Sequence, residues 1–161
     1  MTRFGIGYDA HPLVDGRPLV LAGVSVPFGQ GLEGHSDGDV ASHAITDALL
    51  GALALGDLGT HFKAGDPDVP LGVSSLLLME RAMAMVRERG WQVENVDVTI
   101  VVQQPRLAGH VMAMRQTVAE TLGISIDRVS IKATTTDGMG FPGRGEGIAT
   151  YAVAALTERT P

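Results

Sequence analysis

The chain has 161 residues and no cysteine, so it can form neither a disulfide framework nor a thiolate metal site. Aromatic residues make up only 4% of a sequence that is 45% hydrophobic, which predicts a core of Val, Leu, Ile, Ala and Met. No apolar run approaches the roughly 20 residues of a membrane span, and the first residues lack the apolar stretch of a signal peptide. We expect no membrane partner, and the lack of cysteine suits a cytoplasmic location.

Positive charge is also scarce. Twelve Lys and Arg stand against 18 Asp and Glu, giving a net charge of −6 with no basic cluster, which argues against nucleic acid as a partner. Phosphate binding remains open to an acidic protein if metals, helix N-termini or backbone amides supply the positive potential. The length favours a single domain over residues 1–161.

Hydrophobic periodicity predicts strands interleaved with helices. Residues 147–156 fit either a buried strand or a short helix. The expected strands are 4–9, 96–104 and 129–134, the expected hairpin is 17–21 with 24–27, and the expected helices are 39–54, 74–90 and 107–122. This order predicts an α+β fold: a two-layer domain with a mixed β-sheet, three helices on one face and an N-terminal β-hairpin.

Asp9, His11 and His43 are the most informative residues. Asp9 and His11 alternate on a predicted strand, so both side chains point to the same face. His43 lies on the helix that follows, which could bring it over the strand. Three such ligands with one open position are typical of catalytic zinc; the alternative is three surface residues that never meet.

The segment that leads into this helix is polar and flanked by glycines. Ser36, Asp37 and Asp39 are good N-terminal helix residues, but a cap alone does not require His35 beside them, so the loop also reads as a ligand loop. Asp47, one turn after His43, either orients that imidazole or is a solvated helix residue.

A second glycine-rich loop covers residues 132–147. Its glycines let backbone N–H groups approach an anion, and the hydroxyls of Thr134, Thr135 and Thr136 can donate to phosphate oxygens. Asp137 offers an oxygen ligand for magnesium. A glycine-rich turn without function is the alternative, but three threonines beside an acid favour a ligand loop.

These motifs together resemble those of the 2-C-methyl-D-erythritol 2,4-cyclodiphosphate synthase family. The similarity covers essentially the whole chain, in order and at the family's spacing. It rests on Asp9-x-His11, Gly34-His35-Ser36-Asp37-Gly38-Asp39-Val40, His43-Ala44-x-x-Asp47-Ala48, Gly56-Asp57-Leu58-Gly59, Lys132-Ala-Thr-Thr-Thr and Gly143-Arg144-Gly145-Glu146-Gly147.

The resemblance implies a lyase of the non-mevalonate isoprenoid pathway. It would convert 4-diphosphocytidyl-2-C-methyl-D-erythritol 2-phosphate into the cyclic diphosphate and CMP, by attack of the 2-phosphate on the β-phosphate. It further implies a homotrimer with active sites at subunit interfaces, and no protein nucleophile.

The family's functional residues carry over onto matching positions. Asp9, His11 and His43 would bind zinc or another divalent transition metal, and Asp137 would hold magnesium with the substrate phosphates. His35 and Thr135 would stabilise the transition state, and residues 102–108 would form a cytidine pocket for the adjacent subunit. The implied substrate-binding set is Asp9, Ala10, His11, His35, Ser36, Asp57, Leu58, Gly59, Phe62, Asp66, Val102, Gln103, Gln104, Pro105, Arg106, Leu107, Ala108, Thr134, Thr135, Thr136, Asp137, Phe141 and Arg144.

The sequence departs from the family pattern in three places. Lys63-Ala64-Gly65 replaces residues that often read Pro-Asp-Thr, which puts side-chain contacts there in doubt. Asp137 stands where Glu is common, and Arg106 and Ala108 replace a frequent Lys and a larger apolar residue.

Two rival functions remain open at this point. A zinc-dependent phosphohydrolase could use the same metal ligands to deliver hydroxide to a phosphate ester. A non-catalytic trimeric binding protein, with Phe141 and Arg144 lining an axial cavity, is the other, although it has no need of an open zinc position.

Overall fold

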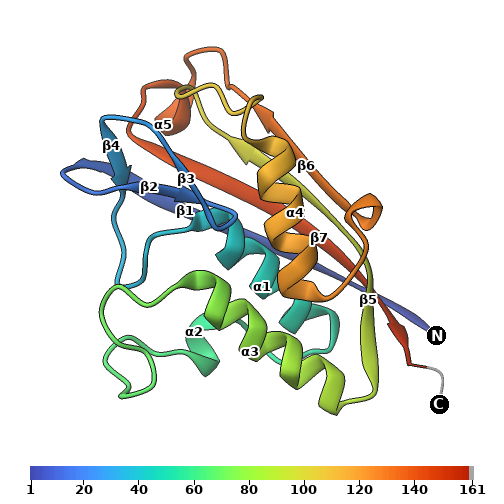
Figure 1. Cartoon of the computed structure of the whole chain (residues 1–161). Helices are drawn as coiled ribbons and strands as arrows, with labels where there is room; N and C mark the ends of the chain where they lie inside the picture. Colours follow the sequence, from blue (N-terminus) through green and yellow to red (C-terminus); the bar gives the residue numbers. More distant parts are fainter. Residues whose placement is uncertain (160–161) are drawn as a thin grey trace.

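A five-stranded mixed sheet forms one layer of the computed structural model, which describes residues 1–159 (Figure 1). The strand order is β4-β1-β7-β5-β6, and every neighbouring pair is antiparallel except β5 and β6. The strands are β1 (Thr2–Asp15), β4 (Gln30–Leu32), β5 (Trp91–Val101), β6 (Val129–Thr134) and β7 (Gly147–Glu158). The open choice at 147–156 is thus decided as a strand, and β1 continues beyond the predicted end at residue 9.

Helices cover one face of this sheet, which confirms the predicted α+β arrangement (Figure 1). The three main helices are α1 (Val40–Ala52), α3 (Ser75–Glu88) and α4 (Val111–Leu122), with short elements α2 (Leu58–His61), α5 (Gly140–Gly143) and η1 (Ile126–Arg128) in the connections. Helix α4 begins later than the predicted residue 107, because the chain first makes a turn in which His110 N–H donates to the Leu107 carbonyl. Within residues 1–159, no helix has both the length and the apolarity needed to cross a membrane.

The predicted hairpin forms from β2 (Leu19–Leu21) and β3 (Val24–Val26), which follow β1 as expected. Its two turn residues, Ala22 and Gly23, both have positive φ, as a type I′ turn requires. Their N–H groups donate to the carboxylate of Asp39 at 2.8 and 2.7 Å, and the same carboxylate accepts from Ser42 at the start of α1. Asp39 therefore caps α1, as predicted, and also links the β2–β3 hairpin to that helix.

Helix α1 lies directly on β1 because two glycines leave room for its backbone. A Cβ added to Gly5 would lie 1.9 Å from the Ala48 carbonyl oxygen, and one added to Gly7 would lie 1.9 Å from that of Ala44. Such contacts are far inside van der Waals distance, so no larger residue fits without moving the helix. This close approach brings His43, next to Ala44, over the strand that carries Asp9 and His11.

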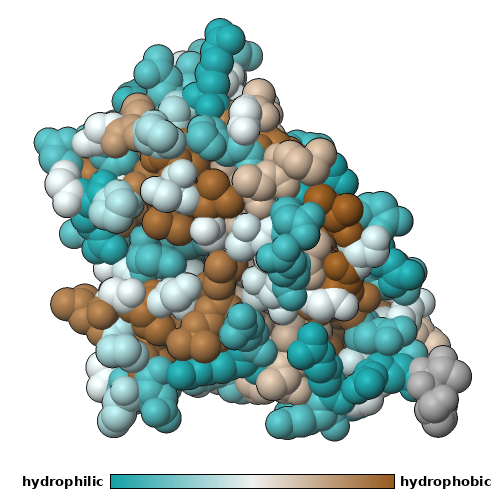
Figure 2. All heavy atoms as spheres, viewed as in Figure 1, coloured by the Kyte–Doolittle hydropathy of each residue, from teal (hydrophilic) through white to brown (hydrophobic). Residues whose placement is uncertain are grey.

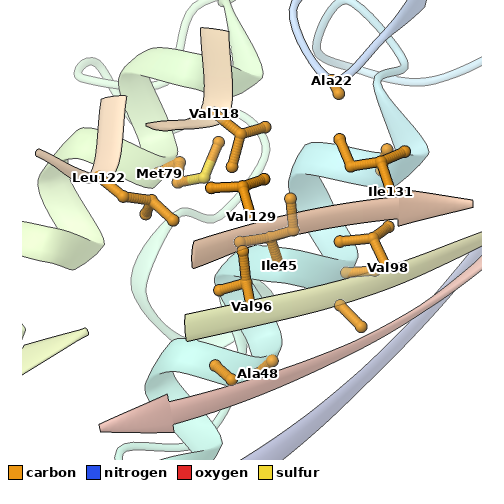
Figure 3. Close-up of a cluster of buried hydrophobic side chains, with 14 of the residues drawn as sticks. Ala22, Ile45, Ala48, Met79, Val96, Val98, Val118, Leu122, Val129 and Ile131 are labelled. Atoms are coloured by element: carbon orange, nitrogen blue, oxygen red, sulfur yellow. The ribbon is translucent and has the colours of Figure 1, made fainter. Parts of the chain in front are cut away.

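The core lies between the sheet and the helices (Figure 3). Ile45 and Ala48 of α1 meet Val96 and Val98 of β5, and α3 and α4 add further aliphatic side chains such as Met79. The core is aliphatic, as the composition predicts, and Trp91 packs at its margin with 8% of its surface exposed.

The opposite face of the sheet, here called the outer face, is uncovered in the single chain and is apolar over β1 and β7. Phe4, Ile6, Tyr8, Tyr151 and Val153 lie on this face of β1 and β7, and Phe4 and Ile6 are each 71% exposed. The helical face shown in Figure 2 is a mixture of polar and apolar side chains instead. A large exposed apolar patch on a sheet is typical of a subunit interface.

Candidate metal centre and substrate hollows

Asp9, His11 and His43 meet at one point between β1 and α1. The Nε2 atom of His11 lies 2.8 Å from Asp9 Oδ2 and 3.3 Å from His43 Nδ1, and His43 Nδ1 lies 3.0 Å from Asp9 Oδ2. Within residues 1–159 this is the one cluster of three or more potential metal-ligating side chains. The predicted convergence of the three residues is therefore confirmed, and His61 and His110 lie outside the cluster.

The donor atoms fit a tetrahedral divalent ion. Zinc bonds of about 2.0–2.2 Å place ligand atoms roughly 3.3–3.6 Å apart, so a small adjustment of the observed triangle accommodates the ion. The side chains are part-buried, with 27% of the Asp9 side chain, 19% of His11 and 11% of His43 exposed. One carboxylate and two imidazoles form a ligand set that suits a divalent transition metal with one position left open.

A backbone contact sets the orientation of His11. Its Nδ1–H donates to the carbonyl of Glu33, since a carbonyl can only accept, and this leaves Nε2 turned toward the cluster. Burial alone would raise the Asp9 pKa, but hydrogen bonds from His11 and His43 outweigh it and lower that pKa to about 2. The hydrogen bond with Asp9 raises the pKa of His11, against the opposing effect of burial.

His43 is held from its other side by two serine hydroxyls. Its Nε2 lies 2.8 Å from Ser75 Oγ and 3.1 Å from Ser36 Oγ. Ser36 was in the predicted site, but Ser75 was not, because Ser75 follows His43 by 32 residues and reads in the sequence only as a helix start. The periodicity of α3 does not reveal which side chain faces α1.

The metal ligands form part of the wall of a hollow of about 490 Å³, here called the first hollow. It brings together eight of the predicted substrate residues with unpredicted Lys63, Ala64, Val69 and Leu78. The eight are Asp9, His11, His35, Ser36, Asp57, Leu58, Gly59 and Phe62.

Two carboxylates in the first hollow have structural partners. Asp57 caps α2, where its Oδ1 accepts from the N–H and the hydroxyl of Thr60. Asp47 accepts from the Leu58 N–H at 2.7 Å, and burial raises its pKa. Asp47 is therefore neither the orienter of His43 nor a fully solvated residue; it ties α1 to α2.

His35 lies in the wall of the first hollow with one ring nitrogen already engaged. Its Nε2–H donates to the Val69 carbonyl at 2.8 Å, and its own backbone carbonyl accepts from Gly72 N–H at 2.7 Å. These two bonds tie residues 69–72 to the metal-site loop. The Nδ1 atom of His35 is left for a ligand.

A second hollow of about 410 Å³ lies beside β6 and the segment before α4. It contains most of the predicted cytidine pocket and two of the threonines: Val102, Gln103, Pro105, Arg106, Leu107, Ala108, Thr134 and Thr135, together with unpredicted Val111, Lys132 and Ala133. In residues 1–159 the two hollows have no lining residue in common. The predicted catalytic pair is thus divided, with His35 in the first hollow and Thr135 in the second.

Seven predicted residues line neither hollow in the single chain: Ala10, Asp66, Gln104, Thr136, Asp137, Phe141 and Arg144. Asp137 has a positive φ of 53°, and its backbone N–H and carboxylate both contact the Thr135 hydroxyl. Arg144 forms a two-point ion pair with Glu146 at 2.7 and 3.2 Å. Ala10 is exposed on β1 between the two metal ligands, on the opposite side of the strand.

One carboxylate and two imidazoles that converge in the wall of a hollow of an α+β domain are typical of a mononuclear metalloenzyme. A family model described as YgbB matches residues 2–157. The 2-C-methyl-D-erythritol 2,4-cyclodiphosphate synthase of Methylococcus capsulatus is 54% identical over 159 residues, covering 99% of this chain and all of the relative. The chain belongs to the YgbB family of cyclodiphosphate synthases.

Solved structures agree over nearly the whole chain. A 2C-methyl-D-erythritol-2,4-cyclodiphosphate synthase in a CDP-bound form is 35% identical with a TM-score of 0.89, covering 96% of this chain and 100% of that one. The bifunctional IspDF from Campylobacter jejuni is 39% identical with a TM-score of 0.93, covering 98% of this chain and 42% of the longer protein. The resemblance seen in the sequence is therefore confirmed.

Proposed function

We propose that this chain converts 4-diphosphocytidyl-2-C-methyl-D-erythritol 2-phosphate into 2-C-methyl-D-erythritol 2,4-cyclodiphosphate and CMP. The observation that supports this most directly is the convergence of Asp9, His11 and His43 beside His35 in a chain whose full-length relatives are synthases of this kind. The phosphohydrolase alternative finds no support among these relatives.

The reaction requires positioning and charge neutralisation more than a protein nucleophile. Asp9, His11 and His43 would hold zinc and Asp137 would offer an oxygen ligand to magnesium, and these ions would supply positive charge to the phosphates. His35, fixed through Nε2, presents Nδ1 toward the transferring group, and the Thr135 hydroxyl is available to donate to it. The new bond joins a 2-phosphate oxygen to the β-phosphorus, while the bond from that phosphorus to the CMP oxygen breaks.

We propose that the active enzyme is a homotrimer, in which the first hollow of one subunit faces the second hollow of its neighbour. Two observations support this. His35 and Thr135, both assigned to the same reaction, lie in separate hollows of one chain. The outer face exposes Phe4 and Ile6, and association would bury them.

The second hollow would then hold the cytidine part of the substrate. A CDP-bound synthase is among the solved structures that this chain resembles. The pocket is bounded by Val102, Leu107 and Ala108, so shape and backbone groups would select the base. The remaining substrate-binding assignments, including Phe141 and Arg144, and the cytoplasmic location stay predictions.

The loop at Lys63-Ala64-Gly65, where the sequence departs from the family pattern, contributes a positively charged side chain. Lys63 lines the first hollow and is the one Lys or Arg among the residues 1–159 that do so. The substrate carries three phosphates, whereas the wall carries the carboxylates of Asp9, Asp47 and Asp57. We assign to the Lys63 ammonium a phosphate contact that replaces contacts of the usual loop.

Phosphorus NMR of the purified protein with substrate, zinc and magnesium tests the activity. CMP with a cyclic diphosphate is the expected result. CMP with a linear bisphosphate would identify a hydrolase instead, and no turnover by zinc-loaded protein would identify a binding role. Light scattering on the same sample tests the trimer, and a monomer with full activity would contradict a shared site.

A further inference from the structure

Behind His43, on the side away from the metal ligands, lies a buried polar cluster. Ser75 is fully buried and Ser36 is 6% exposed, and both hydroxyls face His43 Nε2. Ser75 also contacts the carboxylate of Asp37, which accepts from the Ser75 hydroxyl at Oδ1 and from the Ser75 N–H at Oδ2. The contacts run from Asp37 to Ser75, from Ser75 to His43, and from His43 to the other two metal ligands, Asp9 and His11.

The donors and acceptors in this cluster have one consistent arrangement. A hydroxyl has a single hydrogen, and a carboxylate can only accept, so the Ser75 hydrogen is committed to Asp37. The Ser75 oxygen therefore faces His43 with lone pairs, and Nε2 of His43 must carry the hydrogen that it donates across 2.8 Å. The other nitrogen, Nδ1, faces Asp9 and His11 and in this tautomer would offer its lone pair to a bound metal.

A further amide holds the carboxylate itself in place. Asp37 Oδ1 also accepts from the Asp39 N–H at 3.2 Å, and the Asp37 N–H donates to the Val73 carbonyl at 3.0 Å. Asp37 thus links the start of α1 with the start of α3. Backbone N–H groups at the start of both helices, those of Asp39 and Ser75, therefore fix the orientation of the Asp37 carboxylate.

We propose that Ser75 and Asp37 are positioning residues that hold His43 in the tautomer and orientation required for metal binding. Hydrogen-bonding partners of metal-binding histidines typically govern metal affinity in this way. The inference deepens the proposed function, on whose metal site it rests, but it does not depend on the identity of the substrate. It assigns a role to Ser75 that nothing in the linear sequence marks.

Ser36 does not replace Ser75 in this role. Its oxygen accepts from the Gly38 N–H at 3.1 Å and lies farther from His43 Nε2, at 3.1 Å against 2.8 Å for Ser75. Among its contacts there is no carboxylate that would commit the Ser36 hydrogen elsewhere. Only the Ser75 oxygen is forced to act as an acceptor.

The test measures zinc affinity of the full chain by competition with a chromophoric chelator. The variants are Ser75→Ala, Asp37→Asn and the double substitution. Ser74→Ala is the matched control, because Ser74 is exposed at the same helix start and makes no side-chain capping bond there. Circular dichroism of the metal-free proteins checks that each variant folds.

We expect Ser75→Ala to lower zinc affinity about 10–100-fold and Ser74→Ala to leave it unchanged. Asp37→Asn should have a similar effect, because an amide N–H donated to Ser75 frees the serine hydrogen to point at His43. The double variant should lose no more than the larger single loss, since both residues act through one contact.

A loss below threefold in Ser75→Ala, or one equal to that of Ser74→Ala, overturns the proposal, as does additivity in the double variant. If Ser75→Ala does not fold, Asp37→Asn decides by the same threshold. Zinc affinity is read without substrate. A wild-type protein that binds zinc but turns nothing over would therefore contradict the proposed reaction and leave this inference standing.

Discussion

The metal centre and the glycine-rich loop of residues 132–147 differ in how they are held. At the metal centre each imidazole has a partner on its far side, the Glu33 carbonyl for His11 and the Ser75 hydroxyl for His43. In the loop the side chains are mostly exposed, and contacts such as Thr135 with Asp137 are local. Part-buried polar groups must find protein partners, whereas exposed ones are satisfied by water.

The two regions therefore differ in how far the fold of one chain arranges their side chains. The metal centre is already arranged by the fold, because α1 and β1 approach closely through Gly5 and Gly7. The loop presents hydroxyls and amides whose ligand contacts depend on the substrate and on the neighbouring subunit that we propose. Substitutions at the two regions should therefore have separable effects.

The largest effect is expected at the metal centre. His43→Ala removes one of three ligands, so zinc binding should be lost and turnover should fall to background. This effect should exceed the roughly 10–100-fold loss of metal affinity that is typical when only a hydrogen-bonding partner of a ligand is removed. Zinc content by elemental analysis and CMP release by chromatography are the measurements. His110→Ala, at a histidine outside the cluster, is the control. Substantial zinc-dependent turnover in His43→Ala would contradict the assignment.

A matched substitution in the loop should separate catalysis from metal binding. Thr135→Ala removes one donor to the transferring group and should lower kcat about 100-fold. Zinc affinity and Tm should stay at wild-type values, because the side chain is exposed and contacts only its own loop. Steady-state kinetics and a thermal melt are the measurements. Loss of zinc in this variant would break the contrast between the two regions.

Gly7→Ala tests whether close packing creates the metal centre. The new Cβ would meet the Ala44 carbonyl, so we expect destabilisation of about 1–3 kcal/mol and weaker zinc binding as α1 moves away from β1. For a chain of this size the Tm should fall by roughly 2–4 °C for each kcal/mol. Gly51→Ala is the control on the facing helix α1, where the nearest atom to an added Cβ, the Ile6 carbonyl oxygen, lies 3.8 Å away. Equal Tm values for Gly7→Ala and Gly51→Ala would contradict the inference that the close approach of α1 to β1 creates the metal centre.

A smaller effect is expected from pH. The pKa of His11 is raised by its hydrogen bond with Asp9, so in metal-free protein this pair stabilises the fold below pH 6.5, and the contribution is lost as pH rises through the raised value. Zinc must displace the same proton, so its binding strengthens with pH. The rise in Tm caused by zinc should therefore be larger at pH 8 than at pH 6. Thr135→Ala should show the same trend as wild type.

Much of the fold follows from local pattern. Alternating apolar residues predicted β5 and β6, and the amphipathic spacing around Ile45 predicted α1. The prediction ended β1 too early, where Pro12 interrupts the strand pattern. It left 147–156 undecided because a mostly buried strand loses the alternation that distinguishes strand from helix. The neighbours of β7 on both sides decide its conformation.

The sequence by itself determined the metal ligand types. Asp9 and His11 share a face because strand side chains alternate, and this holds wherever the strand lies in the fold. The absence of cysteine excluded thiolates, and the ordered motifs identified the family. These features depend on residue type and short spacing, which the linear chain contains in full.

Only the tertiary structure decided which distant side chains support the site. Ser75 contacts His43 across 32 residues, Asp47 turns to the Leu58 amide, and Lys63 lines the first hollow. It also placed His35 and Thr135 in separate hollows of one chain. Such pairings depend on how helices pack against the sheet, and side-chain direction at that range is fixed by packing rather than by local spacing.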